Sequence, residues 1–263
     1  IEASGGYEQG VVAALRKAGL IVVVLQPMQV KAFARLKLRR AKNDRLDAHL
    51  IAAVTALVEP RALDSDHRLE QLAHHLTFIE QSEEDIVRCK TRLEHIREPR
   101  LRRIALADIE RLKRRRRTEL ARVARALRAH DDLARRLDLV LSVPGIGLRT
   151  ALTLIVRMPE LGRISREQAA ALAGLAPFDD DSGDRSGQRR IAGGRARVRR
   201  ALFAAALPAA FRWNKALVDF YRRLSAANKP HNLALVACAR KLLIFANTVL
   251  ARGTPWIQDA RSA

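Results

Sequence analysis

The sequence predicts an α/β segment followed by an all-α remainder. An apolar, β-branched run at residues 20–25 lies between two helix-like segments and is typical of a buried parallel strand. Residues 64–137 contain almost no glycine and one proline, and their apolar residues recur at spacings of three, four and seven. Short helical patterns resume after residue 139. We therefore expect three regions, residues 1–62, 63–137 and 138–263.

The N-terminal region alternates predicted strands and helices. Ile1 and Glu2 have the character of a strand end, and helical spacing follows over 7–18 with Gly19 as its stop. Pro27 ends the buried strand, and two further helices are expected over 28–38 and 44–58. Two strands do not form an independent sheet. The region therefore takes strands from elsewhere or begins partway into a domain.

The middle region predicts two long antiparallel helices that turn near residues 97–100. Each helix would be about 50 Å long at ~1.5 Å per residue. Their apolar stripe is narrow, which favours a coiled-coil homodimer.

The C-terminal region begins with a turn, Ser142-Val-Pro-Gly-Ile-Gly147, followed by an apolar helix over 150–158. This pattern resembles a helix-hairpin-helix, whose turn, here with Gly145 and Gly147, presents backbone amides to phosphate. Four more helices are expected, and the aromatic residues within or after them are assigned to the core: Trp213, Phe220, Tyr221 and Trp256.

The net charge is +21 and is concentrated in two blocks. Residues 88–136 hold 18 basic and 7 acidic residues, and residues 182–223 hold 11 and 2. At 48% hydrophobic residues the chain is no disordered basic tail. Such a protein is expected to bind a polyanion, and nucleic acid is favoured. A membrane surface is the weaker alternative because no aromatic-edged amphipathic helix supports it.

Cys89 and Cys238 are too few for a disulfide framework or a zinc site, so a reducing compartment is expected. No segment approaches the ~18 uncharged apolar residues of a membrane span.

Three carboxylates are candidates for a metal site: Glu2 at a strand end, and Asp44 and Asp47 at a helix start. The i,i+3 spacing places both aspartates on one helix face. Converging carboxylates need a cation between them, and an all-oxygen site suits Mg²⁺, which also bridges phosphates. The alternative is that Asp44 opposes the helix dipole and Glu2 is a surface residue. Spacing alone does not decide between the two.

A polar loop over 181–190 combines small residues with Arg185, Arg189 and Arg190. A serine there could attack a phosphodiester while arginines stabilise charge on phosphorus. Ser182 and Ser186 compete for this role, and Ser-Gly pairs also occur in loops for conformational reasons alone. Neither serine has a nearby histidine, so a hydrolase-type triad is not supported.

A glycine pair at 193–194 leads into a helix whose first turns carry four arginines. A helix N-terminus with guanidinium groups is suited to phosphate. The alternative is a glycine cap followed by a solvated face. The four are Arg195, Arg197, Arg199 and Arg200.

Six sequence words in this order resemble the DEDD transposases of bacterial insertion sequences, the family of the pilin-gene invertase and the bridge-RNA-guided recombinases. The resemblance covers essentially the whole chain. The words are Ile1-Glu-Ala-Ser-Gly-Gly-Tyr-Glu8, Lys42-Asn-Asp-Arg-Leu-Asp-Ala48, Val143-Pro-Gly-Ile-Gly147, Leu175-Ala-Pro-Phe178 with Asp181-Ser-Gly183, Gly193-Gly-Arg-Ala-Arg-Val-Arg199 and Gly253-Thr-Pro-Trp256.

The resemblance implies a RuvC-like (RNase H-like) domain over 1–62, a coiled-coil insertion over 63–137 and a C-terminal transposase domain over 138–263. It also implies an acidic tetrad that binds Mg²⁺. Glu2 matches the glutamate of that tetrad, and Asp44 and Asp47 match its last two aspartates.

The resemblance further implies a serine that attacks DNA and forms a covalent phosphoserine intermediate. Ser182 matches this nucleophile, whereas Ser186 falls at a position that the family leaves variable. Implied partners are DNA, an element-encoded guide RNA and further copies of the chain, as a tetramer built from two dimers. A bacterial cytoplasmic, nucleoid-associated protein without membrane contact is expected.

One departure from the family pattern concerns the first aspartate of the tetrad, which normally precedes the first sequence word. The chain starts at that word, so we expect a fragment, a misassigned start or a decayed copy. The leading hypothesis is a DNA transposase and recombinase. The alternatives are a non-catalytic nucleic-acid-binding remnant and a Mg²⁺-dependent junction nuclease without serine chemistry.

Overall fold

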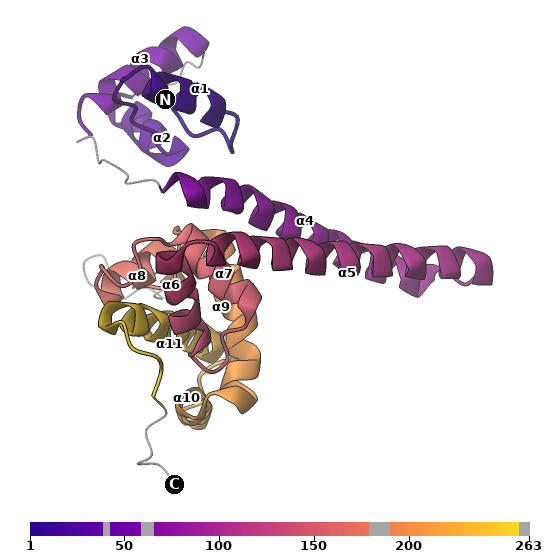
Figure 1. The fold of residues 1–263 in the computed structure, drawn as a ribbon. Helices are drawn as coiled ribbons and strands as arrows, with labels where there is room; N and C mark the ends of the chain where they lie inside the picture. Colours follow the sequence, from indigo (N-terminus) through magenta and orange to yellow (C-terminus); the bar gives the residue numbers. More distant parts are fainter. Residues whose placement is uncertain (39–42, 59–65, 179–189, 258–263) are drawn as a thin grey trace. The chain divides into compact units, whose positions relative to one another are not determined.

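A computed structural model describes residues 1–38, 43–58, 66–178 and 190–257, and the structural statements below concern these residues. The chain divides into two compact units, Ile1–Ser65 and Asp66–Ala263, which are described separately. Almost all regular structure is helical (Figure 1). The all-α character predicted for most of the chain is confirmed. The RuvC-like fold stays a prediction.

The first unit contains three helices, which match those expected from the sequence: α1 (Gln9–Lys17), α2 (Pro27–Leu36) and α3 (Asp44–Thr55). Helix α2 begins at a proline and has a capping box in which the Gln26 and Gln29 side chains each bond the other's backbone amide. A small core joins α2, α3 and the segment before α2 through Leu25, Val30, Leu50 and Val54.

The strand predicted over residues 20–25 is not formed in the described part of this unit. Leu25 alone is in a parallel bridge, with Glu2, while Ile21 is 83% exposed. The prediction of a buried strand was therefore wrong for these residues. The physical reason is the lack of partners: without a neighbouring strand along its length, the run has no ladder to satisfy its backbone groups.

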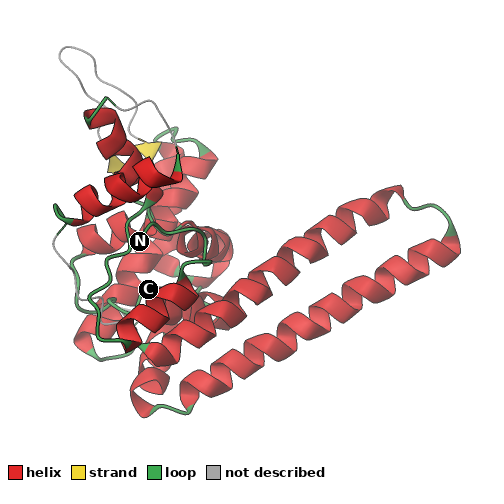
Figure 2. Cartoon of the chain, turned by 90° about the horizontal axis from the view of Figure 1, so that it is seen from above, coloured by secondary structure: helices red, strands yellow, loops and turns green. Residues whose placement is uncertain are grey.

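The second unit starts with the predicted pair of long helices, α4 (His67–His95) and α5 (Pro99–Arg128). They form an antiparallel hairpin that projects from the rest of the unit (Figure 2). The turn lies at residues 96–98, where the Glu98 carboxylate accepts hydrogen bonds from the Arg100 and Leu101 amides and caps α5. The prediction of two antiparallel helices is confirmed.

The remainder of the second unit is a helical body. Its elements are α6 (Asp131–Leu141), α7 (Leu148–Arg157), α8 (Arg166–Ala173), β1 (Pro177–Phe178), β2 (Arg190–Ile191), α9 (Ala196–Pro208), the π-helix η1 (Ala209–Trp213), α10 (Lys215–Ala226) and α11 (His231–Arg252).

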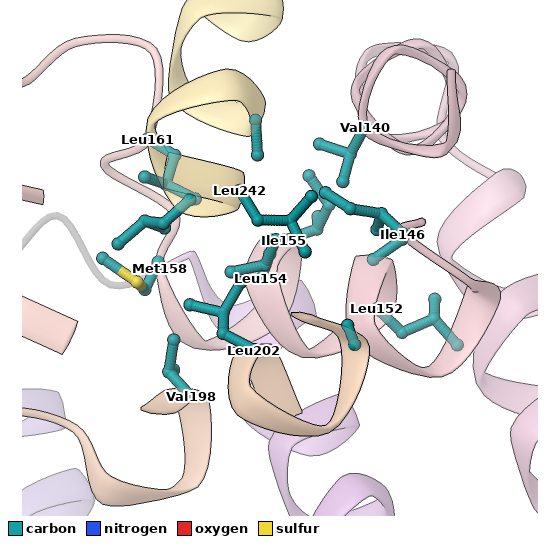
Figure 3. Close-up of a cluster of buried hydrophobic side chains, with 14 of the residues drawn as sticks. Val140, Ile146, Leu152, Leu154, Ile155, Met158, Leu161, Val198, Leu202 and Leu242 are labelled. Carbon is teal, nitrogen blue, oxygen red and sulfur yellow. The ribbon is translucent and has the colours of Figure 1, made fainter. Parts of the chain in front are cut away.

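Helices α7 and α11 form the centre of this body. Every residue of α7 from Thr150 to Val156 is buried, as expected of a helix surrounded by others. Figure 3 shows side chains of α6, α7, α9 and α11 meeting in one cluster. Deleting one of the large buried side chains, such as Leu154, would cost about 2–5 kcal/mol of folding free energy.

Helix α11 is also the one described helix that is long and apolar enough for a membrane span, with a mean hydropathy of 1.8. Two basic residues, Arg240 and Lys241, interrupt its apolar sequence. Half of the apolar window is buried within the protein, where Cys238, Leu242 and Ala246 belong to the core. Its apolar composition is thus explained by packing.

Candidate nucleic-acid interface and catalytic loop

The Glu2 carboxylate extends from a short parallel pairing of the N-terminus with the segment before α2. The Ala3 amide donates to the Leu25 carbonyl at 2.8 Å, and the Leu25 amide donates to the Ile1 carbonyl at 2.8 Å. The Glu2 residue is half-buried. The strand-end position predicted for it is consistent with this bridge.

The two aspartates lie in the first turn of α3. The N-cap is Asn43, whose side-chain oxygen accepts from the Leu46 amide at 2.8 Å, so neither aspartate is needed as the cap. Asp44 is exposed and Asp47 is half-buried. Both carboxylates are favourably placed against the positive end of the helix dipole, as the structural alternative requires.

The three carboxylates belong to the same compact unit, but they do not form a metal cluster there. Among the described residues, no group of three or more His, Cys, Asp or Glu side chains is placed to hold a metal ion. Carboxylate oxygens are the donors that Mg²⁺ prefers. The donor chemistry of Glu2, Asp44 and Asp47 therefore fits Mg²⁺, while their arrangement does not assemble the site.

The loop that carries the candidate nucleophile begins and ends at a two-stranded antiparallel pair. Pro177 pairs with Ile191, and Phe178 pairs with Arg190. This pairing holds the two ends of the loop together, and Arg190 is exposed within β2. Four of the predicted site residues lie outside the described residues: Ser182, Arg185, Ser186 and Arg189.

The glycine pair after β2 packs directly against the end of α8. Gly174 and Gly194 both have positive φ, 68° and 63°, and a Cβ on either would overlap the backbone of the opposite segment. The Arg195 amide donates to the Leu172 carbonyl at 2.7 Å across the same contact. The glycines therefore bring the start of α9 against α8, next to the base of the serine loop.

Two of the four predicted phosphate-binding arginines hold this contact in place. The Arg195 guanidinium pairs with the Glu160 carboxylate and donates to the Arg157 carbonyl at 2.8 Å. Arg199 donates to the Gly193 carbonyl at 2.6 Å. Both arginines thus have partners within the chain.

The other two arginines pair with acidic residues of α4. Arg197 pairs with Glu80, and Arg200 lies 3.3 Å from Glu84. Two arginines of α7 join them: Arg157 Nη2 lies 3.4 Å from Glu80 Oε2, and Arg149 Nη2 lies 2.8 Å from Glu83 Oε2. The acidic part of α4 therefore neutralises arginines that the sequence pattern assigned to phosphate.

Glu80 is the centre of this network, since it pairs with both Arg157 and Arg197. Its side chain is only 8% exposed. Burial lowers the pKa of Arg157, and the attraction of Glu80 offsets part of that effect. Glu80 Oε1 and Arg157 Nε have no hydrogen-bond partner within the described part of the chain. The sequence does carry a signal for this network, since the segment before residue 88 is acidic while the helix after it is basic.

The turn between α6 and α7 contains the two glycines that the sequence pattern assigned to phosphate binding, Gly145 and Gly147. Gly145 has φ 96°, and a Cβ there would overlap that of Ala209. Gly147 is the N-cap of α7 and has open space around it. Gly145 is therefore explained by packing, whereas the exposed Gly147 leaves the amide end of α7 available to a phosphate.

Of the four aromatic residues assigned to the core, three are partly buried and pack against it, namely Phe220, Tyr221 and Trp256, whereas Trp213 does not. Trp213 is 56% exposed, at the end of η1, with the Arg212 guanidinium 4.8 Å from its ring centroid, so the core prediction was wrong for this residue. Trp256 is half-buried against Phe245, with centroids 4.5 Å apart. The π-helix explains the difference, because helical spacing read across it places Trp213 on the wrong face.

A cavity of about 500 Å³ lies beside the α6–α7 turn. Its lining includes Lys215, Lys241 and Arg252, together with the Trp256 side chain and one carboxylate, that of Asp219. The cavity therefore brings three basic side chains close to the turn.

Comparisons with known proteins agree with the six sequence words. A family profile of DEDD-type IS110 proteins, described as "Transposase", matches residues 1–105, and one described as "Transposase IS116/IS110/IS902 family" matches residues 137–222. The pilin gene-inverting proteins of Moraxella bovis and Moraxella lacunata are each 25% identical over 268 residues, which cover 97% of this chain and 80% of theirs.

An uncharacterized 43.6 kDa protein of insertion element IS110 from Streptomyces coelicolor is 33% identical over 115 residues. That alignment covers 43% of this chain and 28% of the Streptomyces protein. The two profiles match separate regions of the chain, and the alignments with the Moraxella relatives cover 97% of it. The chain therefore belongs to the IS110 family of insertion-sequence transposases and is homologous to the pilin gene-inverting proteins.

Proposed function

We propose that this transposase cleaves and rejoins DNA strands through attack of the Ser182 hydroxyl on a phosphodiester. The Oγ–P bond forms as the bond from phosphorus to one deoxyribose oxygen breaks, and the proton of Ser182 leaves as that oxygen becomes a hydroxyl. A hydroxyl of a second strand then attacks the phosphoserine and restores Ser182. One phosphoester replaces another at each step, so no external energy source is needed.

The observation that supports this role best is the pairing of β1 with β2, the two strands that flank the segment containing Ser182 in the sequence. The chain continues from β2 directly into the arginine-rich start of α9. Arg185, Arg189 and Arg190 would stabilise the charge that develops on phosphorus. Arg195, Arg197, Arg199 and Arg200 would reach phosphate only by exchanging their present carboxylate or carbonyl partners. Gly145 and Gly147 would bind the backbone farther along the duplex.

Glu2, Asp44 and Asp47 would hold Mg²⁺, which supplies positive charge at a phosphate oxygen. We further propose a guide RNA that selects the DNA sites, dimerisation through the α4–α5 hairpin and assembly of dimers into a tetramer, in the bacterial cytoplasm at the nucleoid. The outer half of the hairpin supports dimerisation, because Val87, Leu101 and Ile104 are each at least half exposed there.

The test is formation of a protein–DNA adduct. The full chain is incubated with Mg²⁺, RNA transcribed from the element and a plasmid carrying the genomic DNA on both sides of the gene. DNA that stays with the protein on a denaturing gel marks the covalent intermediate. Ser182→Ala should abolish the adduct and Ser186→Ala should preserve it. The opposite pattern would transfer the role to Ser186, and cleavage without an adduct would indicate a junction nuclease.

A second candidate function is a non-catalytic nucleic-acid-binding remnant. The observation that favours it is that no three-carboxylate site is assembled among the described residues. A remnant binds DNA but neither cleaves it nor forms an adduct, and Mg²⁺ does not change its binding. A stop codon or frameshift just upstream of the coding sequence would support this candidate.

A further inference from the structure

The outer face of α5 carries an unusual concentration of arginines. With about 100° of rotation per residue, eight arginines fall within a sector of about 140°. This sector faces away from α4, since the buried residues Ile109, Val123 and Leu127 lie on the opposite side of the helix. All eight are exposed: Arg100, Arg103, Arg111, Arg114, Arg117, Arg122, Arg125 and Arg128.

Little within the protein neutralises this face. Glu110 is the one acidic residue in the same sector. Arg111 pairs with Asp108 at 2.9 Å and Arg128 with Asp138 at 2.5 Å. The guanidinium groups of the other six arginines have no hydrogen bond or ion pair with any described residue.

Folding alone does not account for such a face. Arg111, Arg114 and Arg117 follow one another at i,i+3 spacing, which makes them neighbours on the helix surface, so their like charges repel. An ordinary solvated face mixes signs, as on α4, where Arg88 lies 3.8 Å from Glu84 and 3.7 Å from Asp85. The repulsion along α5 would be relieved by a bound polyanion.

The dimensions of the face fit a stiff double helix. Arg100 and Arg128 are 28 residues apart, or about 42 Å along the helix. A duplex with a persistence length of ~50 nm is straight over this distance and presents about 12 base pairs. The sector contains no aromatic side chain, and single strands are typically bound by stacking on such residues.

We propose that this outer face of α5 binds the phosphate backbone of duplex DNA without reading its base sequence. The choice of DNA rests on the proposed recombinase function. The hairpin projects from the helical body (Figure 2), so a duplex can lie along it away from that body. The face would thus hold DNA flanking the reacting site.

The experiment measures binding alone, with the full chain carrying Ser182→Ala so that strand chemistry does not contribute. One variant replaces Arg114, Arg117 and Arg125 by glutamine. A matched control replaces Lys90, Arg92 and Arg97 by glutamine. It removes the same amount of positive charge from the same hairpin, but at positions outside the arginine sector. A random-sequence DNA duplex of about 24 base pairs, twice the length of the face, is titrated at several salt concentrations. Circular dichroism verifies that both variants are folded.

The arginine variant should bind DNA at least about tenfold more weakly at 0.1 M salt, and its salt slope should fall by about 2 to 3, or ~0.9 for each lost phosphate contact. The control variant should stay close to the parent chain. Equal losses in both variants would show an effect of net charge alone and overturn the proposal. The proposal would also be overturned if the arginine variant bound an RNA duplex of the same sequence more weakly but bound the DNA duplex as tightly as the parent chain.

The failure of the two proposals can be told apart. If the parent chain binds no DNA duplex, the proposed recombinase function fails with this one. If the parent chain binds DNA and the arginine variant binds it equally well, the proposed DNA-binding face on α5 is wrong, while the proposed recombinase function is unaffected.

Discussion

Replacing Glu80 by glutamine tests the ion-pair network between α4 and the helical body. The substitution preserves the shape of the side chain and removes one buried negative charge. Arg157 and Arg197 lose their carboxylate partner, whereas Arg149 retains Glu83. Because Arg157 is 16% exposed and its pKa is already lowered by burial, its charge would be left poorly compensated.

The magnitude follows from the burial of the network. Removing one partner of a buried ion pair costs about 3–5 kcal/mol. The Arg197 side chain is 39% exposed and can be solvated, so we take the lower end, about 3 kcal/mol. For a unit of this size, each 1 kcal/mol lowers the Tm by about 2–4 °C, so a fall of about 6–12 °C is expected.

Thermal and urea unfolding followed by circular dichroism measure this change in the full chain. Glu84→Gln is the matched control, because its partners Arg88 and Arg200 are well exposed and such pairs contribute about 0–1 kcal/mol. Glu80→Leu combined with Arg157→Met should recover part of the loss, since it removes both charges. A Glu80→Gln protein whose stability equals that of Glu84→Gln would refute the reasoning.

Two further predictions concern the sequence words. Gly145→Ala should lower the free energy of unfolding by about 2 kcal/mol, because the new Cβ would overlap Ala209 and the φ of 96° disfavours alanine. Gly147→Ala is the control and should change it far less, because the space around Gly147 is open. Equal denaturation midpoints for the two variants would contradict the packing role of Gly145. Hydrogen bonds from its own backbone amide and from Ser4 lower the pKa of Glu8 to about 2. The folded pKa is depressed, so the turn before α1 is stabilised above pH ~4.5 and loses that stabilisation as the pH falls toward 2. An NMR titration of the Glu8 carboxyl should give a midpoint near 2, and a midpoint near 4.5 would show that this turn is not formed in solution.

Helix positions could be predicted from the sequence because they depend on local periodicity. Helices α3, α5 and α7 begin within a few residues of the starts expected from the sequence, and their N-caps are Asn43, Glu98 and Gly147. The strand at 20–25 failed because a strand depends on partners elsewhere in the chain, which periodicity does not reveal. The core prediction for Trp213 was wrong because the π-helix changes the helix face on which this residue lies.

For the candidate site, too, local sequence features could be predicted whereas contacts between distant residues could not. Its residue types could be recognised from the sequence words, but their partners could not. The pairing of Arg197 with Glu80 joins residues 117 positions apart, which no local pattern contains. Charge counted by segment could not show that arginines of α9 pair with acidic residues of α4, while most arginines on the outer face of α5 have no acidic partner among the described residues.

The boundary of the folded unit does not coincide with the boundary of the family profiles. The first profile ends at residue 105, inside α5, whereas the compact unit begins at Asp66. Helix α4 therefore belongs to the first profile by similarity and to the helical body by packing. Exchange of residues 1–105 between relatives would set a foreign α4 against the resident Arg149, Arg157 and Arg197. Chimaeric transposases should consequently be joined near residue 65, between the two units, if both parts are to keep their inherited partners.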